Sequence, residues 1–152
     1  MGGHFNHNLY VPDYSVAEIR PIAQQSLVAL KALKSMGLVH ADIKPNNLMF
    51  VNPGLYPFKV KPIDFGLARK ISDLKSTSQI QPLGYKAPEV VFGLPMNESV
   101  DMWDLGCSLG YMYLFEHLFT GNCEYEYIAN VQMQGVPPED VLQEGSKSTR
   151  LF

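Results

Sequence analysis

The fold of this chain is decided by the stretch His40-Ala41-Asp42-Ile43-Lys44-Pro45-Asn46-Asn47-Leu48-Met49. It places a carboxylate, a lysine and an amide close together, at Asp42, Lys44 and Asn47. The stretch lies between a predicted helix and a predicted short strand, so it is expected to be a loop. A loop held by regular elements at both ends can aim several side chains at one point. These three residues are therefore candidates for a shared site.

The residues before this stretch predict one amphipathic helix over residues 15–36. Ser15-Val16-Ala17-Glu18 matches a capping box, which satisfies free N–H groups at a helix start. Pro21 falls in the first turns, where its missing N–H costs little. Gly37 can take the left-handed conformation that ends a helix. Apolar residues recur at steps of three and four, as one helix face requires: Ile19, Ile22, Ala23, Leu27, Leu30 and Leu33.

Short strands are predicted at Leu38-Val39, residues 48–51 and residues 58–63, with a turn at Asn52-Pro53-Gly54 between the last two. Residues 64–86 have few apolar anchors and predict one long loop. Loops of that length in compact domains are usually functional or disordered.

The second half of the chain is dominated by residues 99–118, which are nearly all apolar and predict a helix buried on every side. Trp103 and the aromatic residues of 111–115 are therefore interpreted as core. A further helix is predicted over about 125–133, and the residues from there to 152 are expected to be loop. The predicted fold class is α+β, mainly helical with a small β-hairpin sheet.

Composition excludes several classes of protein. The net charge is −3, whereas a generic nucleic-acid binder would be basic. Cys107 and Cys123 form neither a disulfide framework nor a metal-binding spacing, so both are interpreted as reduced thiols of an intracellular protein. His4, His7 and His117 show no metal-ligand spacing either. No apolar run is long enough to span a membrane and no secretory signal is present, so no membrane partner is expected.

Three further motifs come after the opening stretch. They are Asp64-Phe65-Gly66, Ala87-Pro88-Glu89 and Asp101-Met102-Trp103-Asp104-Leu105-Gly106. In this order and at these spacings, the four motifs resemble parts of eukaryotic protein kinases: the catalytic loop, the Mg²⁺-binding motif, the end of the activation loop and the central helix. Each motif alone would be weak evidence, but the ordered set is strong evidence.

Within the kinases, the chain resembles the homeodomain-interacting protein kinases, relatives of the dual-specificity tyrosine-regulated kinases. Most kinases have Arg at the position of Ala41, and this family has Ala. The similarity runs from about Asn8 to Phe152 and includes Leu38-Val39-His40-Ala41-Asp42, Gly93-Leu94-Pro95, Gln134-Gly135-Val136-Pro137 and Gly145-Ser146-Lys147-Ser148-Thr149-Arg150. The resemblance implies that residues 1–152 are a partial C-terminal kinase lobe. It would run from the end of the hinge region through the catalytic loop, activation loop, central helix and following helix, truncated at both ends.

The resemblance also implies a role for each site residue, with ATP and Mg²⁺ as cofactors. Asp42 would be the catalytic base, and Lys44 would offset charge on the transferred phosphoryl group. Asn47 and Asp64 would ligate Mg²⁺, for which oxygen ligands are suited. Met49 would form the floor of the adenine pocket.

The same family pattern predicts two supporting contacts. Asp101 is expected to accept hydrogen bonds from the backbone of the catalytic loop and so keep its side chains aimed. His40 is expected to pack against Phe65 rather than to titrate in catalysis. For an isolated Asp or Lys in a loop, a solvated surface charge is the usual interpretation, and the four ordered motifs reverse it here.

The chain departs from the kinase pattern in two ways. It contains no G-x-G-x-x-G loop and no V-A-I-K lysine, the parts of the N-lobe that hold the nucleotide phosphates, so the N-lobe is expected to be absent. Gln79 stands where the family has a tyrosine, which predicts that switching by tyrosine phosphorylation at that position does not occur.

Three hypotheses remain open. The chain is a serine/threonine kinase acting on protein hydroxyls, seen as a fragment. Alternatively it is an inactive lobe that docks partners on an exposed apolar surface, or a truncated gene product that does not fold stably. A location in the nucleus or cytoplasm is implied by the resemblance, and no nucleic-acid partner is expected.

Overall fold

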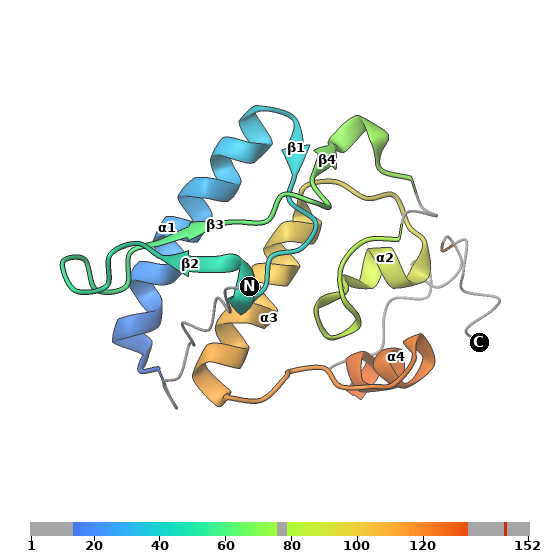
Figure 1. Cartoon of the computed structure of the whole chain (residues 1–152). Coiled ribbons are helices and arrows are strands. Elements are labelled where there is room, and N and C mark those ends of the chain that lie inside the picture. Colours follow the sequence, from blue (N-terminus) through green and yellow to red (C-terminus); the bar gives the residue numbers. More distant parts are fainter. Residues whose placement is uncertain (1–13, 76–78, 134–144, 146–152) are drawn as a thin grey trace, which may run out of the picture.

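The computed structural model describes residues 14–75, 79–133 and 145, which form a mainly helical arrangement with two small antiparallel sheets (Figure 1). The helices and strands are α1 Val16–Ser35, β1 Leu38–Val39, β2 Leu48–Phe50, β3 Val60–Pro62, β4 Arg69–Lys70, α2 Pro88–Phe92, α3 Ser99–Leu114 and α4 Glu124–Met133. Short 3-10 turns lie at Pro45–Asn47, Ile71–Asp73 and Leu83–Tyr85. The expected α+β class is confirmed.

Helix α1 begins and ends where its sequence signals predict. The Ser15 N–H donates to a Glu18 carboxylate oxygen at 2.8 Å, and the Glu18 N–H donates to Ser15 Oγ at 3.4 Å, so both halves of the capping box form. Pro21 is accommodated within the helix. Gly37 follows the helix with a φ of 69°, in the left-handed region that glycine reaches without a steric penalty.

The two sheets differ in how far apart their paired strands lie in the sequence. Strands β2 and β3 form the predicted hairpin, with Leu48 opposite Pro62. Strand β4 lies inside the predicted loop 64–86, which is therefore not all loop, and it pairs with β1 so that Val39 is opposite Arg69. A strand of two residues is too short to show an alternation of apolar and polar residues. It forms because the fold of the intervening chain brings it beside β1.

Helix α3 carries many apolar residues but is buried on one face, so the prediction of burial on every side is wrong. Val100, Leu105 and Met112 are buried, whereas Met102 and Tyr113 are about half exposed. The helix ends at Leu114, and Phe115 caps it with a φ of 55°. Of the aromatic residues taken as core, Tyr113 and Phe115 are exposed.

The core holds the stretch 40–49 between α1 and α3 (Figure 1). Ile43 from that stretch packs with Leu30 and Leu33 of α1 and with Leu105 of α3. A second cluster places Ala41 against α2 and α3; its buried members are Val39, Ala41, Ile80, Ala87, Val90 and Val100. Helices on both sides thus restrict how the loop can move.

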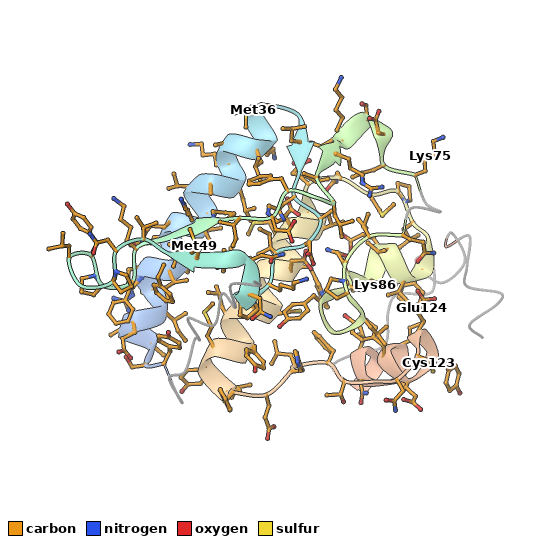
Figure 2. All side chains as sticks on the ribbon, viewed as in Figure 1. Met36, Met49, Lys75, Lys86, Cys123 and Glu124 are labelled. Atoms are coloured by element: carbon orange, nitrogen blue, oxygen red, sulfur yellow. The ribbon has the colours of Figure 1, made fainter. Side chains whose placement is uncertain are left out.

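Helices α2 and α4 close the other end of the molecule. Helix α2 was not predicted; it starts at Pro88, which suits the first helical position, and ends at Gly93 in the left-handed region. Helix α4 confirms the prediction for 125–133. It is tied to the segment before α2 through Lys86, whose Nζ lies 2.9 Å from a Glu124 carboxylate oxygen (Figure 2) and whose carbonyl accepts from the Tyr127 hydroxyl.

Two remaining expectations concern thiols and membranes. Cys107 is buried, Cys123 is exposed, and both are free thiols, as predicted. Within residues 14–133, apart from the undescribed 76–78, no helix has the length and apolar content to cross a bilayer. The loop predicted after α4 lies almost wholly outside the described residues.

The capping box predicts the effect of a point substitution. Ser15→Ala removes a cap and should lower the free energy of unfolding by about 1 kcal/mol, measured by urea denaturation. Ser35→Ala at the other end of α1 is the matched control and should change it by less than about 0.5 kcal/mol. Equal effects of the two substitutions would show that the cap does not stabilise α1.

Candidate active site

Three of the predicted site residues meet at the carboxylate of Asp42. Lys44 Nζ donates to both of its oxygens, at 3.0 and 2.8 Å. Asn47 Nδ2 donates to one of the same oxygens and to the Asp42 carbonyl, each at 2.8 Å. Asp42 and Asn47 are buried and Lys44 is half-buried. The opening stretch therefore does aim its carboxylate, lysine and amide at one point.

The backbone just before Asp42 is held by Asp101, as predicted. The two oxygens of the Asp101 carboxylate accept from the N–H groups of His40 and Ala41, each at 2.8 Å. Ala41 has a φ of 65°, a left-handed conformation that costs energy for a residue with a Cβ. The two hydrogen bonds and the full burial of Ala41 stabilise that conformation, which turns Asp42 toward Lys44 and Asn47.

Two residues of α3 that were given no role hold the middle of the loop. Asp104 Oδ2 accepts from the Ile43 N–H at 3.2 Å, and Ser108 Oγ donates to the Ile43 carbonyl at 3.3 Å. Asp104 lies three residues after Asp101, a spacing that places both on one helix face. That spacing was the signal in the sequence that could have identified it.

Burial perturbs both acids of α3. It raises the pKa of the Asp104 carboxyl to about 9, and the nearby Gln81 amide offsets part of this effect. Burial also raises the pKa of Asp101, although the bonds from the His40 and Ala41 backbone oppose the shift. Asp104 Oδ1 has no hydrogen-bond partner in the described part of the chain. A carboxyl in such a position keeps its proton, because the charged form is poorly solvated there.

Asp64 lies next to this cluster at the end of the β2–β3 hairpin. The Ile63 N–H donates to the Asn47 carbonyl at 2.8 Å, which joins the residue before Asp64 to the loop. Asp64 is exposed, has a φ of 61° and accepts from the Gly66 N–H at 3.2 Å.

The predicted packing of His40 against Phe65 is confirmed. The two ring centroids are 4.7 Å apart. His40 Nε2 lies 3.1 Å from the Ile63 carbonyl, and the side chain is fully buried. His40 thus links the loop to the chain around Asp64.

The donor set at this point suits a magnesium ion. The side-chain nitrogen of Asn47 donates to Asp42, so the side-chain oxygen Oδ1 of Asn47 is the atom that can bind a cation. Asp64 offers an exposed carboxylate. No group of three or more His, Cys, Asp or Glu side chains that could hold a metal occurs among the described residues. Mg²⁺ is commonly held by one or two protein ligands together with water and phosphate oxygens, so two ligands are compatible with it.

Met49 is not a member of the hydrogen-bonded cluster around Asp42. It lies on β2 opposite Lys61, and its side chain is 40% exposed (Figure 2). Its predicted part in an adenine pocket stays a prediction.

A pocket of about 330 Å³ opens beside Asp42 and Lys44. It is lined by Asp42, Lys44, Leu67, Gln79, Ile80, Gln81 and Pro82. Asn47, Asp64 and Met49 are not among its lining residues. The pocket therefore lies on the side of Asp42 formed by residues 79–82, and apart from Asp42 and Lys44 its lining residues are uncharged.

The chain is similar in sequence to known protein kinases. The family model described as protein kinase domain matches residues 2–148. Homeodomain-interacting protein kinase 2 of Mesocricetus auratus is 46% identical over 135 residues, covering 88% of this chain and 12% of the relative. Homeodomain-interacting protein kinase 1 of Caenorhabditis elegans is 47% identical over 135 residues, covering 88% and 16%. Homeodomain-interacting protein kinase 4 of Homo sapiens is 39% identical over 137 residues, covering 88% and 22%. The chain spans less than a quarter of the length of each of these relatives.

The contacts of Asp101 predict a large effect of a nearly isosteric change. Asp101→Asn places an NH₂ group against one of the two backbone N–H groups, so a buried donor loses its partner. The free energy of unfolding should fall by about 2 kcal/mol. Asp73→Asn, at an exposed acid, is the control and should stay within about 0.5 kcal/mol. An unchanged midpoint for Asp101→Asn in urea would contradict this account of the loop.

The pKa of Asp104 predicts a pH dependence of stability. Between about pH 4 and pH 9 the folded state holds a proton that the unfolded state releases, so stability should fall as pH rises, by up to about 1 kcal/mol per pH unit. Unfolding measured at pH 5, 6, 7 and 8 should show that decline, and Asp104→Asn should flatten it. The same slope in both proteins would show that Asp104 does not titrate in this window.

Proposed function

Because the chain belongs to the protein kinase domain family, we propose that it serves ATP- and Mg²⁺-dependent phosphoryl transfer to serine or threonine hydroxyls of proteins. The observation that carries the proposal is the convergence of Lys44 and Asn47 on the Asp42 carboxylate, together with the hydrogen bond from the N–H of Ile63, the residue before Asp64, to the Asn47 backbone carbonyl. Phosphoryl transfer depends mainly on positioning and charge neutralisation, which such a cluster supplies.

Each residue of the cluster has a role in this proposal. When bound, Mg²⁺-ATP would supply the phosphoryl group and neutralise charge on it. Asp42 orients the acceptor hydroxyl and takes its proton. Lys44, 2.8 Å from that carboxylate, offers positive charge to the transferred group. Asn47 and Asp64 present oxygen atoms to the metal, and Met49 contributes an exposed apolar side chain to the adenine side.

The acceptor and location are proposed from the relatives. Their names describe kinases that interact with homeodomain proteins. Homeodomains bind DNA, so this resemblance supports protein substrates and a nuclear, or otherwise cytoplasmic, location for the present chain. The net charge of −3 gives no support to direct binding of nucleic acid.

A second candidate function is a docking module without catalysis. Met49, Phe65 and Leu67 are each at least 40% exposed, which provides apolar surface around the site. The 152 residues also contain no glycine-rich phosphate loop. Turnover of ATP by this chain that requires Mg²⁺ would exclude the module as its sole role.

Replacing the proposed base tests the first function. In a full-length form of the protein with Mg²⁺-ATP and casein as acceptor, Asp42→Asn should reduce phosphoryl transfer by about 10²- to 10⁴-fold, because the hydroxyl loses its proton acceptor. Asp73→Asn removes an exposed carboxylate elsewhere and should retain the wild-type rate. Equal rates for wild type and Asp42→Asn would refute the role of Asp42, and no transfer by the wild-type full-length form would favour the docking module.

A further inference from the structure

The wall of the pocket opposite Asp42 and Lys44 is a short segment, residues 79–82. It comes from the part of the chain that carries few apolar anchors, and no regular element includes it. Its position nevertheless decides the distance between the pocket wall and Asp42. Whatever holds this segment therefore also sets the shape of the pocket.

The side-chain amide of one residue in the segment forms hydrogen bonds through both its nitrogen and its oxygen. Gln81 Nε2 donates to the Val100 carbonyl at 2.8 Å, and Gln81 Oε1 accepts from the Ala87 N–H at 2.9 Å. The side chain is 7% exposed although Gln81 also lines the pocket. Glutamine usually lies at the surface, and a buried amide is stable when its donors and acceptors are paired.

The backbone of Gln81 also has an unusual conformation. Its φ is 66°, in the left-handed region. In an extended chain, successive side chains point to opposite sides, so a buried Ile80 would be followed by an exposed residue. The left-handed turn breaks that alternation, and both Ile80 and Gln81 are buried. The conformation is costly for glutamine and persists because its surroundings hold it.

The anchor of Gln81 is shared with the catalytic loop. Val100 and Asp101 are neighbours in the first turn of α3, and Asp101 accepts the two N–H groups that precede Asp42. The same turn therefore holds the catalytic loop through a carboxylate and the pocket wall through a carbonyl. The separation between Asp42 and residues 79–82 is set by one rigid helix turn.

We propose that Gln81 is a positioning residue, which holds the substrate-facing segment 79–82 against the first turn of α3 and so sets its distance from Asp42. The proposal rests on the proposed phosphoryl transfer, because it assigns the pocket to the acceptor protein. Both hydrogen bonds join neutral groups. Neither bond requires a phosphoryl group on the segment, and the Gln81 amide also lies near the Asp104 carboxyl.

The simpler alternative is that Gln81 fills space in the core and that Ile80 alone anchors the segment. Ile80 packs in the cluster with Val39, Ala41 and Val90 and would remain in place without the amide. The two interpretations predict different results when the hydrogen bonds are removed but the side-chain volume is kept. Gln81→Met makes that change, because methionine is similar in size and cannot pair with either partner.

Amide hydrogen exchange on the full chain tests the hold without any need for catalysis. In Gln81→Met the Ala87 N–H loses its acceptor, and exchange at Ala87 and at residues 79–81 should become about tenfold faster while α1 stays unchanged. Gln79→Met, at an exposed position of the same segment, is the matched control for exchange and should leave Ala87 at the wild-type rate. Unchanged exchange at Ala87 in Gln81→Met would overturn the proposal.

Kinetics separate positioning from simple stability. With casein and Mg²⁺-ATP, Gln81→Met should raise KM for casein about tenfold and leave KM for ATP within about twofold, because the affected wall faces the acceptor. Equal changes in both constants would show a general loss of structure and overturn the assigned role. If Gln81→Met gives no cooperative thermal transition, Gln81→Asn is used instead, since asparagine tolerates the left-handed conformation but is too short to reach both partners.

The outcomes for the two proposals can be told apart. Absence of phosphoryl transfer by the wild-type full-length form refutes the proposed function. The hold by Gln81 is then judged on exchange alone, where faster exchange at Ala87 supports it and an unchanged rate refutes it. Transfer by the wild-type chain with an unchanged KM for casein in Gln81→Met refutes the positioning role while leaving the proposed function intact.

Discussion

The carboxylate of Asp101 is the group on which the rest of the site depends. It is buried and accepts two backbone N–H groups, those of His40 and Ala41. Without these bonds, Ala41 would have no polar partner to hold its left-handed conformation, and Asp42 would not face Lys44 and Asn47. The loop is thus positioned by an acid that lies 60 residues beyond Ala41 in the chain. This acid has no catalytic role in the proposed function.

Other residues of α3 hold neighbouring segments by hydrogen bonds in a similar way. Asp104 and Ser108 hold the two backbone groups of Ile43, one residue beyond Asp42. Val100 accepts from Gln81 in the pocket wall. A single helix therefore presents polar atoms to the segments on both sides of Asp42. A helix is suited to this role because its own backbone is already paired and resists deformation.

Burying these polar groups has an energetic consequence. Two acids on α3 have pKa values raised by burial, and Asp104 keeps one oxygen without a partner in the described part of the chain. A core of apolar residues in the same places would be easier to stabilise. The polar atoms are better explained by what they position than by what they add to stability.

Local patterns in the sequence were sufficient for several features. The capping box and the spacing of apolar residues predicted α1 nearly to the residue, and the kinase motifs predicted that Asp101 would hold the backbone beside Asp42. Signals of this kind succeed because the groups involved are neighbours in the chain or belong to a recurring pattern.

Other features were decided by tertiary structure. Strand β4 exists because β1 lies beside it, and α3 leaves Met102 and Tyr113 exposed because its neighbours cover one face. Gln81 acquires its contacts from Val100 and Ala87, and glutamine in a polar loop carries no mark of that. A short strand, the exposed side of an apolar helix and a buried amide each depend on a partner that the local sequence does not specify.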